Sequence, residues 1–332
     1  MKQKFFDLIR STVTVEFLKD EQIKPVFDLI GELETDHREG SKPNYTIALA
    51  NDVELSKLPQ ATVFYAGDVA EDGFFEFARN NSHWSVIKPG QISGVFSLDR
   101  PEGKIVRMSS CPAGAKFIVN GFALDQAVLL GNQSLIHAAV IESPDGNSRL
   151  VIHAASGIGK TTTTLALAAA GYKICSDDVA VVGSGDNNRS DVWGFPRHLK
   201  VHKKTAEMLP WLHSFITPEG WNHLDEQIIR RSDLDNVGYL ANSAPKTVST
   251  VIALSRSNGK STSLRQQDRF ESLAALSSEN IQFNSTGLLP GHEKRFDIYA
   301  ALIADTTSYE LCVSDDMQEI VDAVDDIVKF QR

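Results

Sequence analysis

The clearest pattern of hydrophobic and polar positions in this chain is an apolar run, a glycine-rich turn and a second apolar run. The first run, 149–153, is rich in β-branched residues and predicts a buried strand. The second run, 161–170, is rich in leucine and alanine and predicts a helix, which Gly171 is suited to end. The pattern therefore predicts a strand, a tight loop over 154–161 and a helix in direct succession.

The segment before this pattern predicts a hairpin that leads into the loop. Residues 122–130 form a short apolar helix candidate, and the apolar run Ser134–Glu142 indicates a strand. Ser143-Pro-Asp-Gly-Asn147 is a strong turn signal between this strand and 149–153.

Short strands and turns dominate the earlier part of the chain. Turn pairs such as Pro89-Gly90 separate the candidates at a spacing of roughly ten residues, which favours a mostly antiparallel sheet. The candidate strands are Tyr45–Ala50, Ala61–Ala66, His83–Ile87, Gly94–Leu98, Lys104–Ser109 and Lys116–Val119.

The fold class expected is α/β, with two domains. Residues 1–120 are expected to be an N-terminal mixed α/β domain that holds a substrate or has another accessory role. Residues 121–332 are expected to be the catalytic domain with a mixed sheet, because strands at Thr247–Leu254 and Tyr309–Val313 alternate with helices at Phe270–Leu276 and Met317–Phe330.

Composition narrows the possible partners. The 332 residues are 42% hydrophobic and 23% charged, typical of a globular protein, and the net charge of −10 argues against non-specific nucleic-acid binding. Three distant cysteines, Cys111, Cys175 and Cys312, favour a reducing cytoplasm over a disulfide scaffold or a zinc site. Charged residues interrupt the segment 1–10, so no signal peptide is expected there, and no run of about 18 apolar residues occurs, so no membrane partner is expected. The sequence is compatible with a homo-oligomer and does not fix the oligomeric state.

The loop has the composition of a phosphate-binding loop (P-loop). Its backbone N–H groups would converge on the phosphates of a nucleotide at the positive end of the helix dipole. Lys160 would reach the β- and γ-phosphates, and the Thr161 hydroxyl would bind Mg²⁺. Ala154 stands where the pattern usually begins with glycine, which is tolerable only if the backbone there needs no positive φ. The alternative is a turn that binds nothing. The residues expected to bind nucleotide are Ser156, Gly157, Ile158, Gly159, Lys160, Thr161 and Thr162.

An acidic pair follows the loop closely. Asp177 and Asp178 come 17 and 18 residues after Lys160, beyond one helix and one short strand. Adjacent residues of an extended segment point to opposite faces, so one carboxylate can serve a metal ion and the other an incoming hydroxyl. The alternative is a solvated turn pair.

Together these segments resemble a known family. The segments 135–142, 156–161 and 171–179 resemble, in order and spacing, the catalytic domain of HPr kinase/phosphorylase, a P-loop fold akin to phosphoenolpyruvate carboxykinase. The resemblance implies ATP and Mg²⁺ as cofactors, Asp177 as general base, Asp178 near the metal and His137 near the transferred phosphoryl group. Residues 1–120 do not resemble the N-terminal domain of those enzymes, and their glycine-rich signature is not found between the Asp pair and the C-terminal helix of this chain. This makes stand-alone relatives, such as lasso-peptide precursor serine kinases, the more similar group.

The densest basic stretch, 197–204, is a further candidate for the site. Arg197 and Lys200 could contact substrate or phosphate, although a charge run of this kind is as well explained by a solvated strand and turn.

Three functions follow as hypotheses. The first is an ATP- and Mg²⁺-dependent kinase that phosphorylates a serine hydroxyl on a peptide or small protein, such as the C-terminal serine of a lasso-peptide precursor. The second is a kinase of a free amino acid or polyol. The third is a nucleotide-binding regulatory protein without turnover.

Overall fold

The chain forms two compact units of mixed α/β structure, which confirms the predicted fold class. The computed structural model describes residues 1–36, 40–50, 60–69, 73–107, 118–185, 187, 189–257, 261–281 and 291–330. The first unit comprises Met1–Ser134 and Gln282–Arg295, and the second comprises Leu135–Ile281 and Phe296–Arg332. The first boundary thus falls at 134/135, whereas the sequence analysis placed it near residue 120, and the chain later returns to the first unit.

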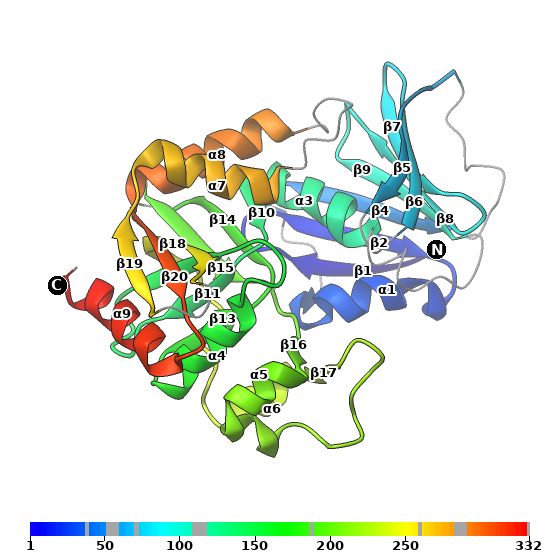
Figure 1. Cartoon of the computed structure of the whole chain (residues 1–332). Helices are drawn as coiled ribbons and strands as arrows, with labels where there is room; N and C mark the ends of the chain where they lie inside the picture. The colour runs from blue at the N-terminus through cyan, green and yellow to red at the C-terminus, as the bar shows by residue number, and fades with distance from the viewer. Residues whose placement is uncertain are drawn as a thin grey trace. The chain divides into compact units, whose positions relative to one another are not determined.

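The first unit is built on one sheet with the strand order β3-β1-β2-β4-β9-β8-β7-β6-β5 (Figure 1). Of the pairings in the described part of this sheet, β2 with β4 and β4 with β9 are parallel and the others are antiparallel. Helices α1 and α3 both pack against β4. The elements are β1 (Lys2–Asp7), β2 (Thr12–Phe17), α1 (Asp20–Ile30), η1 (Gly31–Leu33), β3 (Glu34–Thr35), β4 (Asn44–Ala50), β5 (Thr62–Val69), β6 (Gly73–Arg79), β7 (His83–Lys88), β8 (Ile92–Ser97), β9 (Glu102–Arg107), η4 (Val119–Leu124) and α3 (Asp125–Leu130).

The predicted strands of this region are confirmed where the structure describes them, with one exception. The strand expected at 116–119 lies partly outside the described residues, and its last residue, Val119, begins the helical segment η4 instead. Ser109, the end of another predicted strand, and Cys111 also lie outside the described residues.

The second unit contains a mixed sheet with the strand order β10-β14-β15-β18-β12-β11-β13, to which β20 and β19 are added beside β18. Its elements are β10 (Gln133–Ile136), β11 (Ala139–Glu142), β12 (Arg149–His153), α4 (Lys160–Ala169), β13 (Lys173–Ser176), β14 (Ala180–Ser184), β15 (Ser190–Gly194), β16 (Leu199–His202), α5 (Lys203–Met208), η5 (Pro210–Ser214), β17 (Glu226–Ile229), α6 (Arg231–Asn236), β18 (Lys246–Arg256), β19 (Ser263–Gln266), α7 (Arg269–Asn280), α8 (His292–Asp305), β20 (Thr307–Val313) and α9 (Met317–Phe330). Of these, β10 and α8 begin within the residues assigned to the first unit.

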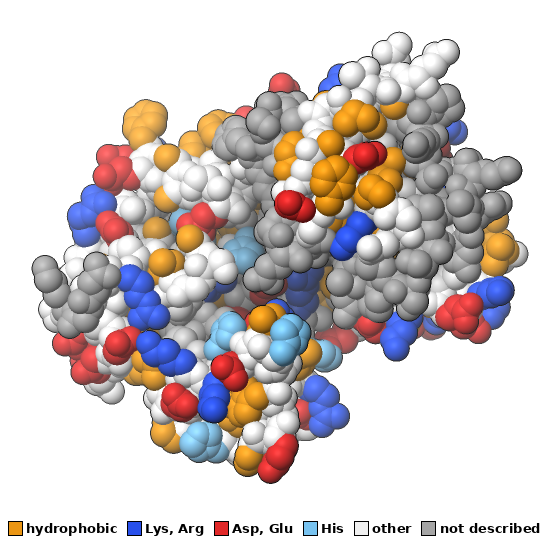
Figure 2. Space-filling view, turned by 45° about the vertical axis from the view of Figure 1, so that its right-hand side comes forward, with side chains coloured by type: hydrophobic (Ala, Val, Ile, Leu, Met, Phe, Trp, Pro, Cys, Tyr) orange, Lys and Arg blue, Asp and Glu red, His pale blue; other side chains and the backbone are white. Residues whose placement is uncertain are grey.

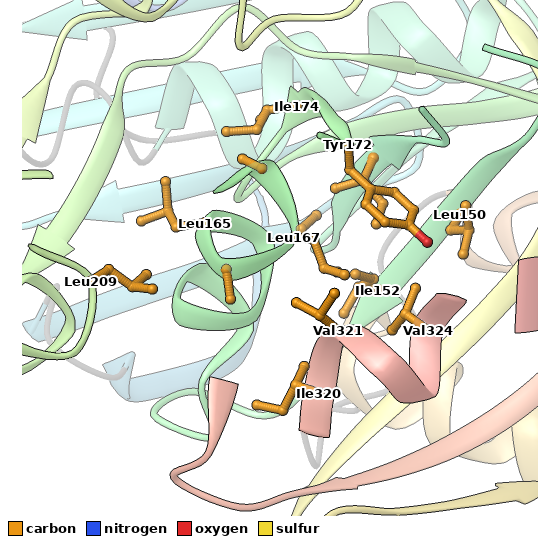
Figure 3. Packing of buried hydrophobic residues seen from close by; sticks show 14 of the residues in the cluster. Leu150, Ile152, Leu165, Leu167, Tyr172, Ile174, Leu209, Ile320, Val321 and Val324 are labelled. Carbon is orange, nitrogen blue, oxygen red and sulfur yellow. The ribbon is translucent and has the colours of Figure 1, made fainter. Parts of the chain in front are cut away.

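Two apolar clusters cover the two faces of this sheet. Alternate residues of β12 separate them: Leu150 and Ile152 belong to one cluster and Val151 to the other. The first cluster packs α4 and α9 against the sheet, as the close-up in Figure 3 shows for Leu165, Leu167, Ile320, Val321 and Val324. The second is formed with α7 and α8 on the opposite face (Figure 1). The strand that leads into the loop is therefore buried on both faces, which explains its unbroken apolar character.

The run predicted as one strand over 134–142 is two strands. β10 pairs with β14, whereas β11 forms the predicted antiparallel hairpin with β12. The chain breaks between them at His137-Ala138, where the Ala138 N–H donates to the Ile136 carbonyl over 3.0 Å. A continuous strand could not pair with both β14 and β12, and the break leaves the His137 side chain 46% exposed.

Elsewhere on the second unit, β16 and β17 form a separate antiparallel ribbon that carries α5, η5 and α6.

On the coloured part of the face in Figure 2, positive and negative side chains are interspersed rather than gathered by sign. Among the described residues, no helix combines the length and apolar character needed to cross a membrane.

Candidate active site

Five strand ends of the second unit meet at one edge of its sheet. β12 runs parallel to β18, and β18 runs parallel to β20. β11 is antiparallel to both β12 and β13, so β13 also runs parallel to β12. The carboxyl ends of β12, β13, β18 and β20 therefore lie at the same edge as the amino end of β11. This is the edge at which open α/β sheets bind their ligands.

The predicted loop connects β12 to α4 at this edge. Gly157 has φ = 80° and Gly159 has φ = 122°, conformations that residues with a Cβ rarely adopt, so both glycines are required for the turn. Ala154, by contrast, has no positive φ, and its methyl group is buried in the core cluster beside α4. The backbone at Ala154 thus places no demand that only glycine could meet.

The loop leaves its polar groups available for a ligand. Ser156 and Gly157 are exposed, and the first N–H groups of α4 have no partner within the helix. Thr162 is positioned by a 2.8 Å hydrogen bond between its hydroxyl and that of Thr205 in α5. At the far end, Gly171 has φ = 100° and the Tyr172 N–H donates to the Leu167 carbonyl, which ends the helix where the sequence predicted.

Asp177 lies at the carboxyl end of β13 and is buried. The Thr161 hydroxyl donates a 2.9 Å hydrogen bond to its Oδ2. Its Oδ1 is buried and accepts no hydrogen bond from any residue that the structure describes. Burial raises the pKa of Asp177 to about 7, an effect that the nearby Asp178 increases, whereas the Thr161 hydrogen bond and the Lys160 ammonium oppose it.

Asp178 is in a different environment. Its side chain is 49% exposed, and its Oδ2 accepts a 3.0 Å charged hydrogen bond from Nη1 of Arg197. Its Oδ1 lies 3.7 Å from Nδ1 of His137. The two adjacent acids therefore differ in solvent access and in their partners.

His137 joins this group from the break before β11. Its backbone N–H donates to Oδ1 of Asn280, the last residue of α7. The pKa of His137 lies below its ordinary value, first because neighbouring protein groups partly desolvate the ring and then because the Lys160 ammonium lies nearby. The imidazole is therefore biased towards its neutral form.

Lys160 extends from the first turn of α4. Its ammonium makes no hydrogen bond or ion pair with any described residue, while Asp177, Asp178 and Glu279 are close enough to act on its charge. Burial lowers the pKa of Lys160, and these three carboxylates oppose the effect.

Of the two basic residues proposed for the site, the structure brings only Arg197 to it. Lys200 lies on the β16–β17 ribbon, where its side chain is 66% exposed and its ammonium lies 3.3 Å from a carboxylate oxygen of Glu226. Lys200 is thus an exposed ribbon residue paired across the strands.

Sequence reasoning missed Glu279, which lies beside His153. His153, at the end of β12, is fully buried, and its Nδ1 lies 3.4 Å from Oε2 of Glu279 in the last turn of α7. An acidic residue at a helix C-terminus is unfavourable with the helix dipole, and this is the signal that could have singled out Glu279.

The described residues contain no group of three or more His, Cys, Asp or Glu side chains arranged to hold a metal ion. A metal at this edge would need ligands from fewer protein groups together with phosphate oxygens and water, the usual arrangement for Mg²⁺.

Comparisons with known proteins give limited information. No family model matches the chain, and no curated protein matches it. Among solved structures, the HPr(Ser) kinase/phosphatase from Coxiella burnetii is similar at 13% sequence identity, over 60% of this chain and 99% of that chain, with a TM-score of 0.33.

Proposed function

We propose that this protein is an ATP- and Mg²⁺-dependent kinase that phosphorylates a serine hydroxyl on a peptide or small protein. The observation that carries the proposal is the position of the acid pair. Asp177 contacts the Thr161 hydroxyl of the loop, and Asp178 lies beside it with His137 and Arg197. A P-loop, a lysine and two distinct carboxylates are the parts that phosphoryl transfer requires.

The chemistry of Asp177 fits a divalent cation. Its Oδ1 is a buried acceptor without a hydrogen bond from the described residues, and its pKa is raised to about 7. A cation bound between Thr161 and Asp177 would give this oxygen a partner and favour its charged form. When bound, Mg²⁺ would neutralise charge on the donor phosphates.

The contacts favour roles for Asp177 and Asp178 that differ from those that the family resemblance implies. Asp177, proposed there as the base, is 7% exposed and its Oδ2 is occupied by Thr161, so an acceptor hydroxyl has little access to it. Asp178 is half-exposed and lies beside Arg197. We therefore assign Thr161 and Asp177 to the metal and Asp178 to the acceptor proton.

In the transfer step, Asp178 accepts the serine proton as the serine oxygen forms a bond to the γ-phosphorus. The bond from the γ-phosphorus to the bridging oxygen breaks, and ADP leaves. Lys160 and the loop N–H groups stabilise the charge on the transferred group, and Arg197 positions the Asp178 carboxylate through its hydrogen bond.

The test is phosphate transfer from labelled ATP with Mg²⁺ to serine-containing peptides, followed by mass spectrometry of the products. Asp178→Asn is expected to reduce transfer by about 100-fold or more with nearly unchanged nucleotide affinity, because general-base catalysis contributes about 10²–10⁴-fold. Asp177→Asn is expected to weaken Mg²⁺-nucleotide binding and transfer together.

Two outcomes would contradict these assignments. If Asp177→Asn abolished transfer but left Mg²⁺-nucleotide binding intact, Asp177 would be the base. If the wild-type protein bound ATP but modified neither peptides nor free amino acids and polyols, the regulatory alternative would replace the kinase. Lys200→Ala, a change on the exposed ribbon, is the matched control and should leave transfer unchanged.

A further inference from the structure

We infer that Arg256 is a second phosphate-binding residue of the nucleotide site, on the side of the loop opposite the acid pair; this inference rests on the proposed function. Arg256 is the last residue of β18, the strand beside β12 and parallel to it. Its place at the carboxyl end of β18 brings it to the edge that carries the loop.

The Arg256 guanidinium lies directly against the loop. A Cβ atom placed on Gly159 would be 3.8 Å from Nη2 of Arg256, which is ordinary van der Waals contact. Gly159 immediately precedes Lys160, the residue expected to reach the β- and γ-phosphates. A guanidinium at this point is within reach of a phosphate chain that binds the loop.

In the protein without ligand, Arg256 is held by a carboxylate that a phosphate can replace. Nη1 of Arg256 donates a 3.2 Å hydrogen bond to Oδ1 of Asp315, which follows the carboxyl end of β20. Asp315 is 64% exposed, and the same oxygen lies 4.0 Å from the Lys204 ammonium. Exposed ion pairs of this kind contribute little to stability, whereas phosphate offers the guanidinium two parallel charged hydrogen bonds. We therefore expect a bound phosphate to replace Asp315 as the partner of the Arg256 guanidinium. The Asp315 carboxylate can then remain beside the Lys204 ammonium.

The two arginines at this edge have separate tasks. Arg197 is mostly buried and paired with Asp178, on the side of the loop that β11 and β13 form. Arg256 is 36% exposed and lies on the β18 and β20 side. Arg197 thus belongs to the acceptor chemistry and Arg256 to the binding of the donor.

The experiment measures, by calorimetry, the affinity of the full chain for Mg²⁺-ADP and for inorganic tripolyphosphate, which lacks the base and the ribose. Arg256→Ala is expected to weaken both ligands by roughly 10- to 100-fold, the effect of losing a charged hydrogen bond. Arg256→Lys should restore part of this loss, and Asp315→Asn should tighten both ligands because it frees the guanidinium. Arg265→Ala, on the exposed strand β19, is the matched control and should change neither affinity.

The outcomes separate this inference from the proposed function. An unchanged affinity for tripolyphosphate in a folded Arg256→Ala protein overturns the inference about Arg256, whether or not ADP binds more weakly. If Lys160→Ala weakens binding while Arg256→Ala does not, the nucleotide site stands and only the role of Arg256 falls. If the wild-type protein binds neither probe, the proposed function falls as well.

Discussion

At the scale of single residues, Asp177 gives the second unit a pH-dependent stability. Its pKa is about 7 in the folded protein, against an ordinary value of 3.8. Below about pH 4 the carboxyl is neutral in both the folded and the unfolded state, so it does not change the free energy of unfolding. Between pH 4 and pH 7 the unfolded chain ionises while the folded protein does not, so stability falls with rising pH. Above pH 7 the carboxyl is ionised in both states, so the loss of stability stays at its full value.

We expect Asp177→Asn to stabilise the protein at pH 8 by about 2–4 kcal/mol in the presence of EDTA, and to have little effect near pH 4. Thermal unfolding over a pH series measures this difference. A stabilisation by Asp177→Asn that did not vary with pH would contradict the buried, protonated carboxyl.

Single residues also show which parts of the site could be predicted. Gly157, Gly159 and Lys160 were predictable because a P-loop is a local structure, determined by residues adjacent in sequence. The burial of Asp177 and the contact of Arg197 with Asp178 depend on side chains packed from other elements, which spacing along the chain cannot report. For the same reason, nothing local distinguished Arg197 from Lys200.

At the scale of elements, Arg149 connects β12 to its neighbours. Its guanidinium is fully buried, lies 3.2 Å from Glu142 of β11, and donates 2.7 Å hydrogen bonds to the carbonyls of Val192, Ala244 and Asn242. One side chain thus joins the hairpin, β15 and the segment before β18, at the end of β12 remote from the loop.

We expect Arg149→Ala to destabilise the second unit by about 3–5 kcal/mol, because it leaves three carbonyls without this donor and removes a cation from the buried Glu142. Urea unfolding followed by circular dichroism measures the change. Arg265→Ala removes an exposed arginine paired with Glu310 and should change the stability far less, because exposed ion pairs contribute little. Equal losses in the two variants would show that Arg149 is not a structural link.

Element prediction succeeded where partners are close in sequence. The hairpin of β11 and β12 and the succession of β12, loop and α4 follow from local turn and periodicity signals. The sheet order does not, because β12 pairs with β18 across roughly a hundred residues of chain. Arg256 and Glu279 reach the site through this long-range pairing and packing, so they could not be found from spacing.

At the scale of the whole molecule, the first unit depends on a distant part of the chain. Arg295, in the first turn of α8, donates a hydrogen bond to the buried carboxylate of Asp125 in α3. Burial raises the pKa of Asp125, and the charge and hydrogen bond of Arg295 oppose this shift. Nη1 of Arg295 also lies 3.3 Å from Nδ1 of the buried His292.

We expect Arg295→Ala to destabilise the first unit by about 3–5 kcal/mol, because Asp125 would lose the cation that compensates its burial. Hydrogen exchange of peptides from β1, β2 and α3 measures the loss within that unit. The double variant Asp125→Asn/Arg295→Met, which leaves no buried charge, should recover most of it. Additive losses in the double variant would rule out a coupled pair.

The return of the chain at 282–295 constrains how the second unit can be inherited or isolated. Its coding information is split into two stretches, 135–281 and 296–332, so recombination at one breakpoint transfers it only together with the intervening segment 282–295. A minimal gene for this unit must therefore join codon 281 to codon 296 through a spacer. Truncation after residue 281 removes β20 and α9, whereas truncation before residue 135 alone retains a segment whose packing partners are gone.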